Sequence, residues 1–188
     1  MKKAIVLLAD GFEDVEAITP IDYLRRAGID VTVASISKKH KVEGRWSGIK
    51  VIAGATLAEL ISINKDLKHW DAVIIPGGIP GATNLAESQD VCTLLNEMAI
   101  TGKLICAICA SPAVVLAPLG LLAGKKFTCY PKMEERVKDG EWSEDRVVVD
   151  GNIITSRGAG TAGEFAIAII EKLLGEAAAK KIADAVLL

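Results

Sequence analysis

Short, wholly apolar segments alternate along the chain with longer stretches that carry apolar residues at helical spacing. Residues 4–8 (AIVLL) and 72–75 (AVII) contain no polar side chain, as expected of strands buried on both faces of a sheet. Residues 15–27 between them have the spacing of a helix and are followed by Gly28, a typical helix terminator. This alternation predicts an α/β fold, a doubly wound, mostly parallel sheet with helices on both faces.

The rest of the chain continues the pattern. Further strands are expected at residues 31–34, 104–108, 147–149 and 153–155, a β-hairpin within 35–52, and further helices at 91–99, from 113 onward, at 161–174 and at 177–187. The charged stretch 124–145 is expected to be irregular, with one short helix at 133–138. Because no repeat or low-complexity linker interrupts this order, we expect residues 1–188 to form a single domain.

Charge and hydropathy exclude several classes of partner. The net charge of −2 gives no electrostatic reason for binding nucleic acid, and the basic run at 38–41 (KKHK) is expected to be a solvated hairpin tip. The apolar run at residues 4–9 is too short for a signal peptide, and no segment approaches the length of a membrane span. We therefore expect a cytoplasmic protein with no membrane partner, whose four cysteines are free thiols.

Three loops follow the ends of predicted strands, at residues 10–16, 76–81 and 109–112. In an open parallel sheet, ligands bind at the edge formed by the carboxyl ends of the strands. The sequence therefore predicts one site built from these three loops.

The candidate nucleophile of that site is Cys109, in the segment Ala107-Ile108-Cys109-Ala110-Ser111-Pro112. It lies between a strand and a predicted helix, where Pro112 fits the first helical turn. A thiol at a helix start faces unpaired N–H groups and the positive end of the helix dipole, which favour the reactive thiolate. The small Ala107 and Ala110 suit a tight turn. The competing interpretation is an inert buried cysteine.

Glu16 is the candidate proton carrier beside Cys109, because it lies one turn into the first helix, among apolar neighbours. We expect its carboxyl group to be protonated and hydrogen-bonded to the thiolate. Glu13 and Asp14 precede the helix body and are expected to be exposed carboxylates at the helix start.

Histidine is scarce: the chain contains only His40 and His69. His40 falls in the predicted hairpin, and His69 precedes the strand at 72–75, at the opposite edge from the predicted site. A cysteine–histidine hydrolase is therefore not expected from one chain.

Other motifs compete for a functional interpretation. Cys106-Ala-Ile-Cys109 has the spacing of a dithiol redox site, but Cys106 falls inside the strand. Residues 158–163 (GAGTAG) match a dinucleotide motif, but no strand follows them, so we expect a tight turn. Residues 77–81 (GGIPG) lack the ending of a phosphate-binding loop, and their N–H groups are candidates to hold an oxyanion beside Cys109.

Together these residues make the chain resemble the ThiJ/PfpI superfamily nearly end to end, in the branch of the Parkinson's-disease-associated protein deglycase. The resemblance rests on residues 10–16 (DGFEDVE), 24–28 (LRRAG), 76–78 (PGG), 107–110 (AICA) and 155–158 (TSRG). It implies a flavodoxin-like sandwich, a homodimer, and Cys109 as an oxidation-prone nucleophile hydrogen-bonded to protonated Glu16. It also implies an oxyanion site from the N–H groups of Gly78 and Ala110. Gly77, Tyr130 and Arg157 are expected near the pocket, with no metal ion and no cofactor.

The sequence departs from this family at two positions. Ala110 replaces the histidine that follows the cysteine in PfpI-type proteases, and Tyr130 stands where the deglycase has a histidine. The resemblance therefore implies a glyoxalase-III/deglycase-type enzyme acting on methylglyoxal, glyoxal or their early protein adducts, and argues against a protease or amidase. The alternative is a non-enzymatic redox sensor or stress chaperone that works through oxidation of Cys109. Both use the same residues, so the sequence leaves both open.

Overall fold

Seven strands form one sheet in the order β10-β11-β7-β6-β1-β2-β5 in the computed structural model, which describes residues 1–63 and 69–188. The strands are β1 (Lys3–Leu8), β2 (Asp30–Ser35), β5 (Ala55–Thr56), β6 (Ala72–Ile75), β7 (Leu104–Ile108), β10 (Val147–Asp150) and β11 (Ile153–Ser156). All neighbours are parallel except β10, which pairs antiparallel with β11 around a turn. The predicted flavodoxin-like, mostly parallel sheet is confirmed.

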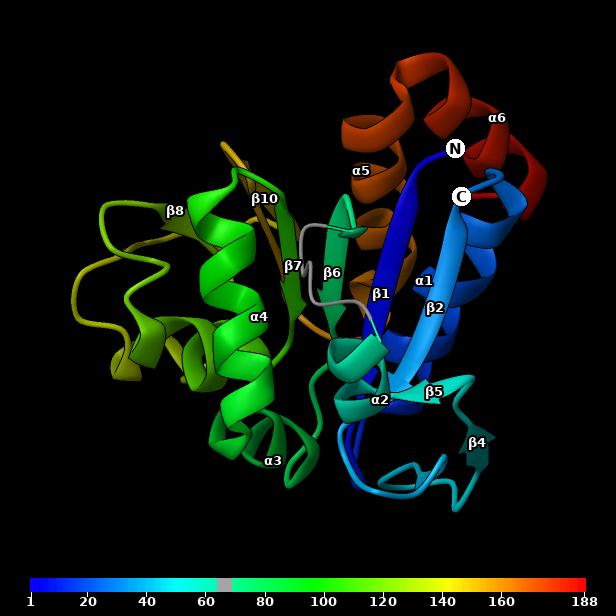
Figure 1. Ribbon diagram of the computed structural model, residues 1–188. Helices are drawn as coiled ribbons and strands as arrows, with labels where there is room; N and C mark the ends of the chain where they lie inside the picture. Colours follow the sequence, from blue (N-terminus) through cyan, green and yellow to red (C-terminus); the bar gives the residue numbers. More distant parts are fainter. Residues whose placement is uncertain (64–68) are drawn as a thin grey trace.

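Helices cover both faces of this sheet (Figure 1). One layer contains α1 (Asp14–Arg26), α5 (Ala162–Leu174) and α6 (Glu176–Val186), and the other contains α2 (Leu57–Ile63), α3 (Gly81–Glu87) and α4 (Gln89–Ile100). Strand β7 contributes side chains to the hydrophobic cores on both faces of the sheet. Cys106 and Ile108 pack toward the first layer, and Ile105 and Ala107 pack toward the second. Among the helices of the described residues, none combines the length and apolar character needed to cross a membrane.

The order of the strands places the predicted loops together. Strand β2 lies on one side of β1, and β6, which comes later in the chain, lies on the other side. The order in which strands are added to the sheet therefore reverses between β1 and β6. Such a switch point opens a crevice beyond the carboxyl ends of the strands. Those of β1, β6 and β7 lie together at the lower edge of the sheet in Figure 1.

Two small sheets lie outside the central one. The expected hairpin consists of β3 (Lys41–Glu43) and β4 (Lys50–Ile52), which pair antiparallel. The basic residues 38–41 are exposed, but they lie at the start of β3, whereas the tip of the hairpin consists of residues 44–49. In the second small sheet, β8 (Lys126–Phe127) pairs parallel with β9 (Glu141–Trp142).

The segment after Cys109 differs most from the expectation of a regular helix. It forms one π-helical turn at Pro112–Leu116 and one 3-10 turn at Ala117–Leu119, and it ends at Gly120. Pro118 has no N–H to continue an α-helical ladder, and Gly120 takes a left-handed conformation that stops the helix. The expected helix at 133–138 is likewise reduced to a 3-10 turn at Glu134–Arg136.

Candidate active site

Cys109 occupies a sharp turn directly after β7. Its φ of +65° is left-handed, which is uncommon for a residue with a side chain. Tertiary hydrogen bonds hold it there: its N–H donates to the Ser156 carbonyl over 2.9 Å, and its own carbonyl accepts the Tyr130 N–H over 2.8 Å. Backbone strain maintained in this way is typical of functional positions. The sharp turn predicted from the sequence is thus present.

The Glu16 carboxyl group lies beneath this turn, with only 1% of the residue exposed. It lies close enough to the Cys109 thiol for each group to shift the pKa of the other, and its Oε2 accepts the Gly77 N–H over 2.9 Å. Burial, to which the negative charge of Glu13 adds, raises the pKa of Glu16 from 4.5 to about 7. A carboxyl group with a pKa near neutrality can both accept and donate a proton at physiological pH.

The thiol is not activated by a helix as the sequence suggested. Burial and then the charge of Glu16 raise the pKa of Cys109, whereas the N–H groups of Ala110 and Gly78 lower it. The helical turn that follows has only five residues, so it supplies little dipole to oppose desolvation. The thiol therefore depends on Glu16, which repels the thiolate when ionised and donates a hydrogen bond to it when protonated.

Close backbone approach explains the two consecutive glycines of the loop after β6. A Cβ atom on Gly77 would lie 2.7 Å from both Cys109 Cβ and Glu16 Oε2. Gly78 has a φ of +88°, and a Cβ there would lie 2.5 Å from the Gly11 carbonyl oxygen. Only glycine lets this loop place its N–H groups beside the sulfur.

A cavity of about 490 Å³ opens over the thiol. Its lining residues come from five segments of the chain and the hairpin: Glu13, Glu16, Arg45, Trp46, Gly78, Ile79, Cys109, Ala110, Tyr130, Met133 and Ala159. Tyr130 lines the cavity as expected, whereas Gly77 is not among the lining residues and donates its N–H to Glu16. Arg157 is not among the lining residues, because its guanidinium donates to the Glu144 carbonyl over 3.1 Å.

Several of these residues have no recognisable signal in the sequence. Arg45 and Trp46 reach the cavity because the hairpin folds back onto the first loop, where Phe12 pairs with Gly44 and the Arg45 N–H donates to the Phe12 carbonyl. The Arg45 guanidinium stacks 4.3 Å from the Trp46 ring centroid. Glu13 was expected only as an exposed carboxylate. It does cap α1, as its side chain accepts the Glu16 N–H over 2.8 Å, and it also faces the thiol cavity.

The remaining candidates lie elsewhere. His40 contacts the Ala53 carbonyl, and His69 lies 2.9 Å from the Lys3 ammonium near the start of β1, so neither lines the cavity. Cys106 is buried within β7 and is unpaired, so no disulfide joins it to Cys109. Residues 158–163 form a tight turn between β11 and α5, as expected. The described residues contain no group of side chains suited to hold a metal ion.

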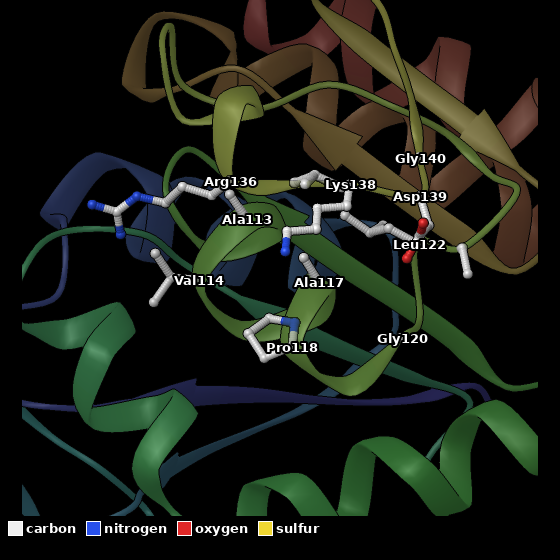
Figure 2. Close-up of a pocket in the computed structure, with 12 residues that line it drawn as sticks. Ala113, Val114, Ala117, Pro118, Gly120, Leu122, Arg136, Lys138, Asp139 and Gly140 are labelled. Atoms are coloured by element: carbon white, nitrogen blue, oxygen red, sulfur yellow. The ribbon is translucent and has the colours of Figure 1, made fainter.

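A second cavity, of about 350 Å³, lies beside the helical turn that follows Cys109 (Figure 2). The long side chains of Arg136 and Lys138 lie over the turn that contains Ala113 and Ala117. Its lining contains no cysteine, histidine or glutamate. The chemistry is therefore concentrated at the Cys109 cavity, which we take as the candidate active site.

Known proteins resemble this chain in sequence and in fold. The sequence matches the DJ-1/PfpI family over residues 2–172. It is 37% identical over 179 residues to the glutathione-independent glyoxalase DJR-1.2 of Caenorhabditis elegans, covering 93% of this chain and 90% of that protein. The structure of oxidized Toxoplasma gondii DJ-1 has a TM-score of 0.93 at 39% identity, covering 100% of this chain and 98% of that chain. DJ-1 homologs A and B of Arabidopsis thaliana are each 40% identical over 183 residues, but the chain spans only 45% and 40% of their lengths.

Proposed function

The chain belongs to the DJ-1/PfpI family, and we propose that it is a cysteine-dependent glyoxalase or deglycase acting on methylglyoxal, glyoxal or their early adducts on proteins. One observation carries the proposal: the Cys109 thiol is paired with a carboxyl group of pKa about 7 and faces two backbone N–H groups. The glyoxalase name of the C. elegans relative supports the same class of reaction.

The first step is addition of the thiol to an aldehyde. Glu16 accepts the proton of Cys109 while the sulfur attacks the carbonyl carbon, and the C=O electron pair moves onto oxygen. The N–H groups of Gly78 and Ala110 stabilise that developing negative charge. Glu16 then returns the proton to the oxygen, which gives a neutral hemithioacetal with every atom and charge accounted for.

The groups that can transfer a proton at this site favour an aldehyde substrate over a peptide substrate. Peptide hydrolysis must protonate a leaving amine, the task of the histidine in cysteine proteases, and no imidazole lines the cavity. Addition to an aldehyde releases no leaving group, so one carboxyl group can carry the single proton involved. The cavity, at about 490 Å³, also exceeds the needs of a small dicarbonyl and leaves room for an adduct on a side chain.

Methylglyoxal turnover by the wild type and by Cys109→Ser tests the proposal. We expect formation of lactate by the wild type and its loss in the variant, with Cys92→Ser as the matched control because Cys92 is partly exposed on α4 and remote in sequence from the site. Equal turnover by the wild type and Cys109→Ser, or none by either, would overturn the enzyme proposal.

A second function uses the same residues. One solved relative was described in an oxidized form, and a protonated Glu16 can donate a hydrogen bond to a sulfinate on Cys109. Peroxide titration followed by mass spectrometry tests this sensor or chaperone role. It predicts that oxidation of Cys109 stops at sulfinate in the wild type and proceeds to sulfonate in Glu16→Ala, whose side chain has no hydrogen-bond donor. Identical oxidation products in the two proteins would argue against it.

The proposal includes a homodimer in a reducing compartment such as the cytoplasm. Apolar side chains that are 41–70% exposed lie on α1 and the hairpin, at Val15, Ile18, Ile49 and Ile52, and Ile18 and Ile52 line the same cavity. Burying such a patch against a second copy removes it from water. The four unpaired cysteines are consistent with a reducing environment.

A further inference from the structure

A glyoxalase needs more proton transfers than the addition step uses. Converting the hemithioacetal of methylglyoxal into an ester of lactate moves a hydrogen from C1 to C2, which requires a base that reaches the C1–H bond. Glu16 has just delivered its proton to the oxygen on C1, so it is available as an acid only after another exchange. The sequence has Tyr130 where a histidine was expected for a second base.

Glu13 is the other carboxyl group on the wall of this cavity. Its side chain is fixed at one oxygen, since Oε2 accepts the Glu16 N–H over 2.8 Å. Its backbone is fixed as well, because the Glu13 N–H donates to the Gly77 carbonyl over 3.0 Å. Within the described residues, its second carboxylate oxygen accepts no hydrogen bond from a protein group.

The two carboxyl groups occupy contrasting environments. Glu16 is buried, whereas Glu13 is partly exposed at the start of α1, where its side chain accepts the Glu16 N–H. The charge of Glu13 in turn adds to the raised pKa of Glu16. Contrasting environments of this kind divide neighbouring carboxyl groups into an acid and a base. The other charged or titratable side chains on the cavity wall are Cys109, Arg45 and Tyr130.

We propose that Glu13 is the second acid–base residue of the site, the base that removes the C1–H proton of the hemithioacetal; this role rests on the proposed glyoxalase function. The C–H electron pair forms a C1=C2 bond, and the C2=O electron pair moves onto its oxygen. The ionised Glu16 accepts the O–H proton on C1 and passes it to the oxygen on C2, and Glu13 returns the first proton to C2, which leaves a thioester and both carboxylates ionised. Water then hydrolyses the thioester to lactate and the free Cys109 thiol, with no net change in oxidation state.

The test compares Glu13→Gln with the wild type in two assays. Glutamine can still accept the Glu16 N–H through its amide oxygen, but it cannot take up a proton. We expect kcat for methylglyoxal to fall by about 10²- to 10⁴-fold, the contribution of a general base. Alkylation of Cys109 by iodoacetamide should stay within about threefold of wild type, because addition to the sulfur does not use Glu13.

Asp14→Asn is the matched control. It removes one carboxylate next in sequence, and its side chain can still accept the Ser47 hydroxyl that Asp14 binds at 2.7 Å, outside the cavity. Its kcat should remain at the wild-type level. Turnover in D₂O adds an independent readout, because a partly exposed base exchanges its proton with solvent and should place deuterium at C2 of lactate.

The outcomes separate the two proposals. Wild-type turnover that requires Cys109 but is unchanged in Glu13→Gln overturns the role of Glu13 alone. Lactate formed in D₂O without deuterium at C2 does the same, since it indicates direct hydride transfer. A wild-type protein that consumes no methylglyoxal overturns the proposed function and this role with it.

Discussion

The Gly77 N–H donates a 2.9 Å hydrogen bond to Oε2 of Glu16, although 61 residues separate them in sequence. This bond joins the loop after β6 to the first turn of α1 and fixes the buried carboxyl group against Cys109. The same loop presents the Gly78 N–H to the sulfur. One contact thus orients the proposed proton carrier and aligns the loop that holds the proposed oxyanion donor.

The reactivity of Cys109 should follow the ionisation of Glu16. Below a pH of about 7 both groups hold their protons, and above it the ionised Glu16 can accept the thiol proton while the sulfur attacks, even though its charge keeps the pKa of Cys109 raised. The rate of alkylation by iodoacetamide should therefore rise through pH 7, measured by mass spectrometry with Cys92 as the internal reference. In Glu16→Gln this inflection should vanish. A wild-type profile that rises only above pH 8.5, as for an ordinary thiol, would contradict the pairing.

The buried Glu16 should make stability depend on pH. Its pKa is raised from 4.5 in the unfolded chain to about 7 in the fold, so between these two pH values the folded state binds the proton more tightly than the unfolded state does. The free energy of unfolding therefore falls as the pH rises from 4.5 to 7. The loss above pH 7 is about 3 kcal/mol, from 2.5 pKa units at 1.36 kcal/mol each. Glu16→Gln should therefore gain stability relative to wild type between pH 5 and pH 8 in urea unfolding. A constant difference at both pH values would refute the raised pKa.

Gly78→Ala should be costly because of both conformation and space. Its φ is +88°, and the added Cβ would lie 2.7 Å from the Glu13 backbone nitrogen. We expect a loss of about 2–4 kcal/mol in unfolding free energy and loss of rapid Cys109 alkylation. Gly102→Ala is the control, because Gly102 has a φ of +66° with open space around it and should lose only about 1–2 kcal/mol. Equal losses would show that crowding at Gly78 has no effect.

The exposed apolar patch should hold the proposed homodimer together. Ile18→Glu combined with Ile52→Glu places charges on α1 and β4, and we expect the protein to become monomeric in light scattering coupled to size exclusion. Ile100→Glu is the control, since Ile100 is 80% exposed on α4 in the opposite helix layer. A light-scattering mass equal to that of the monomer for the wild-type protein would contradict the proposed dimer.

Much of the fold follows from local patterns in the sequence. The apolar runs at 4–8, 72–75 and 104–108 became β1, β6 and β7, because a strand buried on both faces needs no polar residue and leaves an unmistakable pattern. The short elements β5, α2 and α3 were missed. They have two or seven residues each, too few for a periodic signal, and their packing against the sheet stabilises them.

Local sequence patterns were enough to predict the candidate site and its two leading residues. A cysteine between a strand and a proline-initiated turn, and a glutamate among apolar residues after the first strand, are local features that put Cys109 and Glu16 at one edge of a parallel sheet. The surroundings of these two groups emerged only from the folded chain. Burial raised the pKa of both groups against the expected pull of a helix, and Glu13 and Arg45 entered the cavity through contacts with distant loops. Desolvation and proximity depend on everything packed around a group, so no stretch of sequence read alone contains them.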